Sequence, residues 1–179
     1  MTRRTFNRVF AWQMTGPQAA TAAALLAGAV ARGGPVYAVI AIARGGIQPA
    51  RDIAAALGAP VRTVQAGHNP TDAIYTEATG RVSCDVIEAG PLRGRVLVVD
   101  DICGTGATLT TVTSALARLA APGTTLLTAT LCRNAGSPCR PDLTVWDDLR
   151  EWVVFPWEAG PPDGLPVRCL PDPGQALVA

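Results

Sequence analysis

Apolar residues in this chain form short runs that alternate with segments of helical periodicity. The runs of strand length lie at 36–43, 60–64, 95–99 and 125–132. The segments whose apolar residues recur on one helical face lie at 19–31, 47–57 and 108–119. This alternation of strand and helix predicts an α/β fold, with a mostly parallel, twisted sheet flanked by helices and joined by right-handed crossovers.

The N-terminal third contains a pattern that imitates a signal peptide. Arginines precede the alanine-rich run over 19–31. However, the polar and turn residues of 12–17 separate the arginines from the alanine-rich run. Leu26 and Val30 also have the spacing of a packed helix face. We therefore expect a helix that covers the core. No apolar run reaches the ~20 residues of a membrane span, so no membrane partner is expected.

The remaining segments carry weaker signals. Residues 65–80 are rich in turn formers and predict a long loop, followed by a polar strand over 81–88. A short strand over 152–155 interrupts a tail rich in proline and glycine, whose last part, from Pro161, is too short to fold alone. With 179 residues, 49% of them hydrophobic, residues 1–179 suit a single domain.

Functional side chains follow two of the predicted strands. Arg44-Gly45-Gly46 ends the first, and Asp100-Asp101 ends the strand over 95–99, followed by a Gly-Thr-Gly loop and a helix. Ligands of parallel sheets bind outside the carboxyl ends of the strands. A helix N-terminus suits a phosphate, and paired carboxylates suit sugar hydroxyls. The pattern predicts a sugar-phosphate site shared by both loops.

Other phosphate-binding motifs fail on specific residues. All fifteen cationic side chains are arginine, and a Walker loop requires lysine. A dinucleotide fingerprint requires a third glycine where Leu109 stands. The net charge of +1 gives no reason to expect a nucleic-acid partner.

The cysteines suggest reduced thiols. There are five, without a CxxC pair, which favours a cytoplasmic protein over a disulfide framework. Cys103 lies in the Gly-Thr-Gly region, but the chain has one histidine, His68, and a Cys–His catalytic pair has little support. His68 itself is more typical of a loop residue than of a catalytic acid or base.

Three motifs in order carry a family resemblance: Arg44-Gly45-Gly46, Val96–Leu109 and Trp152–Glu158. They are similar to the pyrophosphate loop, the diphosphoribose motif and the base-binding end of type I phosphoribosyltransferases, nearest the xanthine-guanine and hypoxanthine subgroup. The resemblance implies the family's fold, with a core over about 18–132 and a small C-terminal hood over about 133–160 that also uses N-terminal residues.

The resemblance also implies an activity: transfer of ribose 5-phosphate from phosphoribosyl diphosphate to a nucleobase, a 6-oxopurine, with release of pyrophosphate and with Mg²⁺ as cofactor. By it, Asp100 and Asp101 would hold the ribose hydroxyls and, partly through water, the metal. Arg44, Gly45 and Gly46 would bind the pyrophosphate. The loop 65–80 would close over the site. By analogy the enzyme would be a cytoplasmic homo-oligomer of purine salvage.

The resemblance extends to the phosphate and to the base. The residues implied to bind the 5′-phosphate are Cys103, Gly104, Thr105, Gly106, Ala107 and Thr108. Trp152 would stack on the base, and the backbone of Val153 would meet its edge. Arg133 stands near the place where oxopurine enzymes carry a lysine that reads the 6-oxo group, although a solvated arginine after the strand is the alternative.

Gly104 departs from the family pattern. Many purine members carry there an aspartate that serves as general base, a contribution worth ~10²–10⁴ in rate. Its absence leaves the acceptor base open, so an enzyme for a specialised base is one alternative. A regulator that senses phosphoribosyl diphosphate or a nucleotide without turnover is the other.

Overall fold

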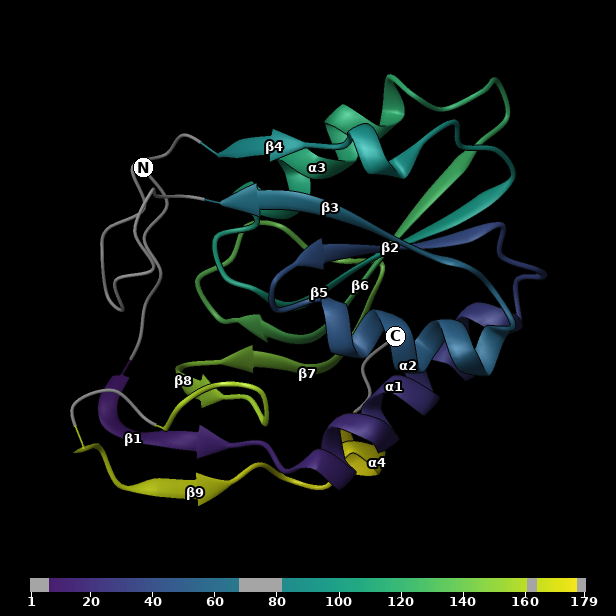
Figure 1. The fold of residues 1–179 in the computed structure, drawn as a ribbon. Helices are drawn as coiled ribbons and strands as arrows, with labels where there is room; N and C mark the ends of the chain where they lie inside the picture. The colour runs from purple at the N-terminus through teal and green to yellow at the C-terminus, as the bar shows by residue number, and fades with distance from the viewer. Residues whose placement is uncertain (1–6, 68–81, 161–163, 177–179) are drawn as a thin grey trace.

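The computed structural model describes residues 7–67, 82–160 and 164–176 (Figure 1). The elements are β1 (Asn7–Gln13), α1 (Gly16–Ala31), β2 (Ala38–Ala43), α2 (Ile47–Leu57), β3 (Val61–Gly67), β4 (Ser83–Asp85), the short 3₁₀ helix η1 (Ile87–Ala89), β5 (Arg95–Cys103), α3 (Ala107–Ala117), β6 (Thr125–Asn134), β7 (Leu143–Leu149), β8 (Glu151–Val154), β9 (Val167–Cys169) and α4 (Pro173–Ala176).

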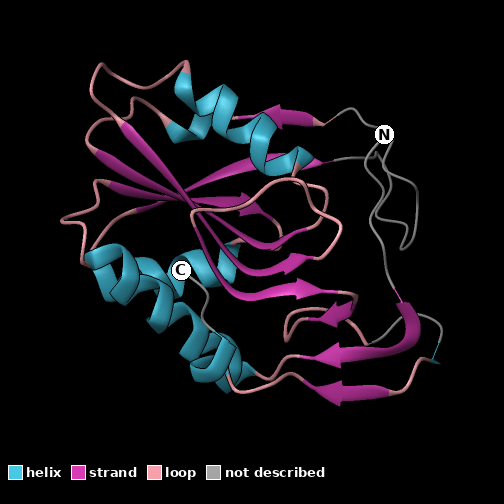
Figure 2. Ribbon diagram, turned by 180° about the vertical axis from the view of Figure 1, so that it is seen from behind, coloured by secondary structure: helices cyan, strands magenta, loops and turns pink. Residues whose placement is uncertain are grey.

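The larger sheet has six strands in the order β4-β3-β2-β5-β6-β7. All neighbouring strands are parallel except β4, which runs antiparallel to β3. Helices α1 and α2 cover one face of this sheet, and α3 covers the other (Figure 2). The predicted α/β fold with a mostly parallel sheet is confirmed.

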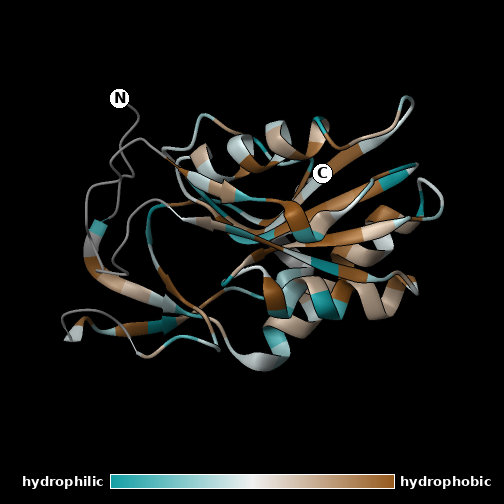
Figure 3. Cartoon of the chain, turned by 45° about the horizontal axis from the view of Figure 1, so that its top comes forward, coloured by the Kyte–Doolittle hydropathy of each residue, from teal (hydrophilic) through white to brown (hydrophobic). Residues whose placement is uncertain are grey.

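The core forms two layers because the strands alternate their side chains. Val39 and Leu97 face α1 and α2, whereas Ile40 and Val98 face α3, and all four are fully buried. Apolar residues accordingly dominate the central strands (Figure 3). Burial on both faces explains why β2 and β5 appear in the sequence as continuous apolar runs.

Helix α1 is the covering helix that the sequence predicts. It begins with a capping box, in which Thr15 Oγ1 accepts from the backbone N–H of Gln18 at 3.3 Å and Gln18 Oε1 accepts from that of Thr15 at 3.0 Å. Leu26 and Val30 are buried against the sheet. Within the described residues, no helix is both long and apolar enough to cross a membrane.

A second, smaller sheet lies beside the first, in the order β8-β1-β9, with parallel pairing throughout. Only β8 is close to a predicted strand. The prediction missed β1, β7 and β9. Within the described residues 164–176 the tail packs rather than frays: β9 pairs with β1, and Leu170 is buried. This sheet combines β1 from the N-terminal part with β8 and β9, and β9 lies beyond the boundary near 160 that is expected for the hood. The division into core and hood stays a prediction.

Two further predictions need correction. The polar strand over 81–88 is wrong beyond Asp85, because the Asp85 carboxylate accepts from the N–H of Ile87 at 2.9 Å and turns the chain into η1. Strand β5 continues to Cys103 rather than ending at 99. Strand β3 takes in the start of the predicted 65–80 loop, and residues 68–81, with His68, lie outside the described residues.

Candidate functional site

The two predicted loops meet at the carboxyl ends of β2 and β5, which are neighbours in the sheet. The α-carbon of Gly45 faces Asp101, and a Cβ there would lie within 2.7 Å of both carboxylate oxygens. At Gly46 a Cβ would lie within 2.7 Å of the backbone carbonyl oxygens of Ile42 and Val99. At Gly46 only glycine fits, because a Cβ would meet the backbone, whereas at Gly45 a Cβ would displace the Asp101 carboxylate. The two glycines thus let this loop contact β5 directly. The peptide bond between Ala43 and Arg44 is cis.

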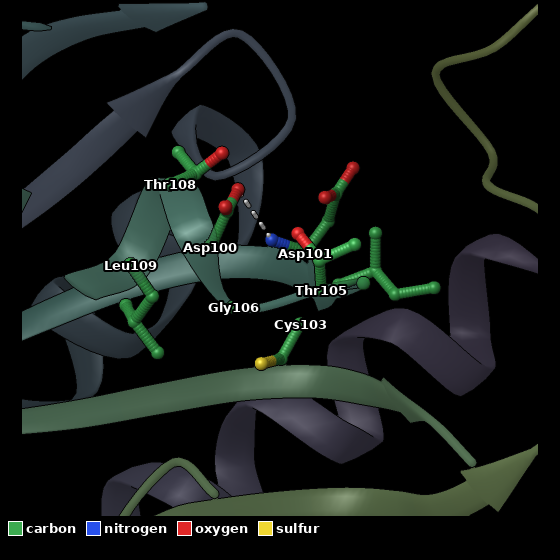
Figure 4. A pocket seen from close by; sticks show the side chains of 9 residues that line it. Asp100, Asp101, Cys103, Thr105, Gly106, Thr108 and Leu109 are labelled. Atoms are coloured by element: carbon green, nitrogen blue, oxygen red, sulfur yellow. Dashed lines mark hydrogen bonds between the residues drawn. The ribbon is translucent and has the colours of Figure 1, made fainter. Parts of the chain in front are cut away.

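Asp100 and Asp101 belong to the last residues of β5. The backbone N–H of Asp101 donates to Asp100 Oδ1 at 3.0 Å. Successive residues of a strand point to opposite faces. Figure 4 shows the Asp100 carboxylate beside Thr108, whereas the Asp101 carboxylate points away from α3. Asp101 is 9% exposed and lies against Gly45. The two carboxylates thus point to different sides of the strand end.

The turn from β5 into α3 encloses a pocket of about 90 Å³. Its lining comprises Asp100, Asp101, Ile102, Cys103, Gly104, Thr105, Gly106, Thr108 and Leu109. A water molecule takes ~30 Å³ in the liquid, so the pocket has room for a phosphate-sized group. The N-cap residue of α3 is Gly106, which has no side chain to bind the first amides of the helix, and of these amides the Ala107 N–H donates to Thr105 Oγ1 at 3.3 Å. These amides and the helix dipole favour an anion there.

The segment 135–140 packs against this turn. Gly106 has φ +80°, and a Cβ on it would lie within 3.0 Å of the Cβ and Sγ of Cys139. Cys103 Sγ lies 3.3 Å from Ser137 Oγ. Burial raises the pKa of the Cys103 thiol to about 12, and a thiol of that pKa is not a nucleophile near neutral pH. Cys103 therefore offers this pocket no reactive thiolate near neutral pH.

Arg133 follows Cys132 at the carboxyl end of β6 and lies opposite Cys103 of β5. Its guanidinium is buried: Nε donates to Asp147 Oδ1, and Nη1 donates to the carbonyl oxygen of Ser137 at 2.9 Å. The alternative of a solvated arginine is therefore wrong. The sequence analysis missed Asp147 because its strand, β7, was not predicted.

The smaller sheet supplies the expected base-binding residues. Trp152 is half-buried on β8, and Val153 is buried and pairs with Trp12 of β1. The turn after β8 brings in Glu158, whose Oε2 accepts from the N–H of Phe155 at 3.1 Å. Partial burial raises the pKa of Glu158, and the negative charge of Asp101 adds to the rise. The Asp101 carboxylate is therefore near enough to act on Glu158 electrostatically.

Glu158 is a second residue whose place the sequence analysis missed. It was part of the third motif but had no assigned role. Glu158 follows β8 of the smaller sheet, whereas Asp101 lies at the end of β5 in the larger sheet. The sequence spacing of the two residues therefore gives no sign that they interact.

The protein ligands fit a hard cation that keeps much of its water. Among the described residues, no group of three or more His, Cys, Asp or Glu side chains could hold a metal ion. Asp100 and Asp101 offer carboxylate oxygens at one strand end. Mg²⁺ is typically bound through one or two carboxylates, with waters and substrate phosphates completing its octahedron. The donor set thus suits Mg²⁺ held jointly with a ligand.

Comparison with known proteins identifies the family. The family model of the phosphoribosyl transferase domain matches residues 15–163. None of the curated proteins matches this chain.

Solved structures have similar folds. A purine phosphoribosyltransferase from Pyrococcus horikoshii has 27% identity and a TM-score of 0.71, over 84% of this chain and 95% of that chain. A hypothetical protein from Neisseria gonorrhoeae with bound ppGpp has 26% identity and a TM-score of 0.58, over 83% and 90%. The Helicobacter pylori xanthine-guanine-hypoxanthine phosphoribosyltransferase has 19% identity and a TM-score of 0.65, over 83% and 93%.

Proposed function

The chain belongs to the phosphoribosyl transferase domain family, and from this premise we propose that it transfers ribose 5-phosphate from phosphoribosyl diphosphate to a 6-oxopurine. Membership in this family supports an enzyme that transfers a phosphoribosyl group to a nucleobase. The observation that carries the proposal is the contact between Gly45 and Asp101. It joins a loop suited to pyrophosphate to an acid suited to ribose.

Each part of phosphoribosyl diphosphate would have its own partners. The 5′-phosphate would bind in the pocket at the start of α3, on the amides of Cys103 to Thr108 and the hydroxyls of Thr105 and Thr108. The pyrophosphate would bind Arg44 and the amides of Gly45 and Gly46. The ribose hydroxyls would donate to Asp100 and Asp101.

Mg²⁺ would be held by Asp100 and Asp101, partly through water, together with oxygens of the substrate. When bound, it supplies positive charge that neutralises the leaving pyrophosphate. The chain's own contribution is to place the two carboxylates: β5 fixes their backbone, and Gly45 leaves room for Asp101. Holding these groups in place before reaction lowers the barrier without reorganisation.

In the reaction, the bond between ribose C1 and the pyrophosphate oxygen breaks, and pyrophosphate leaves with the electron pair. A bond forms between C1 and a base nitrogen, whose proton passes to water. Gly104 offers no carboxylate for that proton. Catalysis would therefore rest on orientation and charge stabilisation, which together can supply most of a rate enhancement.

The base would lie between the smaller sheet and the carboxyl ends of β5 and β6. Trp152 would stack on its ring, the backbone of Val153 would meet its edge, and Arg133 would donate to its exocyclic oxygen. Similarity to a purine phosphoribosyltransferase from Pyrococcus horikoshii supports a purine. An oxo group is the better match, because a guanidinium has only donors.

A second candidate is regulation by nucleotide binding at the same site. The similar Neisseria gonorrhoeae protein contains ppGpp, which joins a purine to ribose phosphates. A pocket for a phosphoribosyl group and a base presents the donors that such a nucleotide requires. Under this candidate the nucleotide competes with phosphoribosyl diphosphate.

Pyrophosphate release, measured with phosphoribosyl diphosphate, Mg²⁺ and a panel of bases, tests the proposal. We expect turnover with hypoxanthine, guanine or xanthine and little with adenine. Turnover only with a different base would reassign the substrate. Tight binding of phosphoribosyl diphosphate without turnover of any base would favour the regulatory candidate.

A further inference from the structure

We infer that Asp147 is a positioning residue for the base: it holds the Arg133 guanidinium in one orientation, so that the site selects a base with an oxo group over one with an amino group. This inference rests on the proposed function. It concerns a buried ion pair that the sequence motifs do not contain.

Arg133 is fixed through two different nitrogens. Nε donates to Asp147, and Nη1 donates to the Ser137 carbonyl oxygen at 2.9 Å. Two partners on one planar group determine its plane as well as its place. These contacts use two of the five N–H donors of the guanidinium. Since an arginine carries ~2 kcal/mol of rotamer entropy, anchoring it before the base arrives reduces the cost of binding.

Asp147 is itself held by several donors. Its Oδ1 accepts from the N–H of Asp148 at 2.8 Å as well as from Arg133, and its Oδ2 lies 3.5 Å from Nη1 of Arg140. Burial opposes its charge, but these partners outweigh burial and lower the pKa of Asp147. The side chain is 16% exposed, whereas that of Arg133 is 5% exposed. Asp147 is thus an ionised carboxylate that pairs with the buried Arg133 guanidinium.

The backbone is shaped to make this pair. The register between β6 and β7 shifts between Cys132 and Asn134, at the position of Arg133. Asp148, directly after Asp147, has φ +57°, which is rare for a residue other than glycine. A bulge of this kind turns a side chain toward a new partner. Here it brings Asp147 to Arg133.

Arg133 is also connected to the phosphate pocket. Ser137, which binds Arg133 through its carbonyl, contacts Cys103 through its hydroxyl at 3.3 Å. Cys103 lines the pocket at the start of α3. Ser137 thus contacts both the Arg133 guanidinium and Cys103 of the loop that would hold the 5′-phosphate.

The chemistry of the pair gives the selectivity. A guanidinium donates to a carbonyl oxygen and cannot accept from an amino group. An amino group facing it would leave buried donors unpaired on both sides, which costs affinity. If Asp147 loses its charge, Arg133 loses an anchor and the buried cation loses its counter-charge. Loss of this charge would therefore weaken binding of the base and leave binding of the ribose phosphate unchanged.

Binding of inosine 5′-monophosphate and of ribose 5-phosphate, measured by calorimetry on the full chain, separates these effects. We expect Asp147→Asn to weaken the nucleotide about tenfold, equivalent to ~1.4 kcal/mol, and to change ribose 5-phosphate less than about twofold. The base KM should rise by a similar factor while kcat and the KM for phosphoribosyl diphosphate change little, and the preference for hypoxanthine over adenine should shrink. Asp147→Glu keeps the charge and should recover part of the nucleotide affinity.

The matched control is Asp148→Asn. Asp148 is exposed and contacts Arg150 at the surface, at 3.8 Å, and asparagine tolerates its positive φ. This variant should bind both ligands like the wild type. Equal nucleotide affinity in Asp147→Asn and Asp148→Asn overturns the role of Asp147, as does an equal loss for both ligands. If either of these results is found while the wild type is active, the proposed function still stands. A wild type that turns over no base contradicts the proposed function itself.

Discussion

The α-carbon of Gly45 lies against the carboxylate of Asp101, so closely that a Cβ at Gly45 would come within 2.7 Å of both oxygens. Gly45 follows β2, and Asp101 belongs to β5. The contact therefore joins the loop after β2 to the end of β5, more than fifty residues away in the chain. The Asp101 carboxylate occupies the space that a side chain at position 45 would need.

Gly45→Ala should reduce turnover strongly. The new methyl group occupies the space of the Asp101 carboxylate, so either the acid or the loop must move. Misplacement by about 1 Å can cost ~10²-fold in rate. We expect a loss of that order in kcat/KM for phosphoribosyl diphosphate, measured by pyrophosphate release, together with folding close to the wild type by circular dichroism.

The control for this substitution is Gly28→Ala. Gly28 is exposed on α1, and a Cβ there meets nothing within 4 Å. Alanine should stabilise the helix by ~0.5–1 kcal/mol and leave turnover unchanged. If Gly45→Ala retains the turnover of Gly28→Ala, then the Asp101 carboxylate has no fixed place in the reaction.

Asp100→Asn and Asp101→Asn should each reduce turnover in the presence of Mg²⁺. An amide is neutral, so it loses attraction for a divalent cation and places an N–H₂ donor where the ribose hydroxyls would donate. Titration of Mg²⁺ should show a raised half-saturation concentration in both variants. Near-normal rates and an unchanged Mg²⁺ dependence would remove both residues from the assigned roles.

The central part of the fold could be predicted because local signals and burial agree there. The β2 and β5 runs are apolar on both faces, and the helix over 47–57 ends at Gly58, which has φ +63°. The site loops follow from that sheet, since parallel strands place their carboxyl ends together. The sequence thus predicts which loops lie side by side.

The smaller sheet and the ion pair could not be predicted in the same way. Strand β9 has three residues, all exposed, so its sequence carries no burial pattern. Asp147 lies on β7, whose polar residues Asp147 and Asp148 weaken the strand signal. Its pairing with Arg133 depends on a register shift, which is a property of two strands together rather than of either sequence.

Thiol labelling should separate Cys103 from Cys169. Burial raises the pKa of Cys103 to about 12, so at pH 8 only about one molecule in 10⁴ carries the thiolate. Cys169 is exposed on β9. Iodoacetamide under native conditions, followed by peptide mass spectrometry, should label Cys169 first and Cys103 only after denaturation. Cys103→Ser should keep measurable turnover; its complete loss would contradict the backbone role given to Cys103.

The lowered pKa of Asp147 predicts how its contribution to stability depends on pH. Burial opposes ionisation, and the bonds from Arg133 and from the Asp148 N–H more than offset it, so the folded state holds the carboxylate charged to lower pH than the unfolded chain does. Such a group stabilises the fold above its unfolded pKa of about 3.9, and the contribution is lost as pH falls through the folded value.

The free energy of unfolding, measured with urea at several pH values between 7 and 3, should therefore be lower for Asp147→Asn than for the wild type at pH 7, and the gap should narrow toward pH 3. Asp148→Asn supplies the comparison, because its exposed carboxylate is only weakly paired. A gap that stays constant over this range would mean that Asp147 stabilises the fold by packing alone and that its charge has no part in holding Arg133.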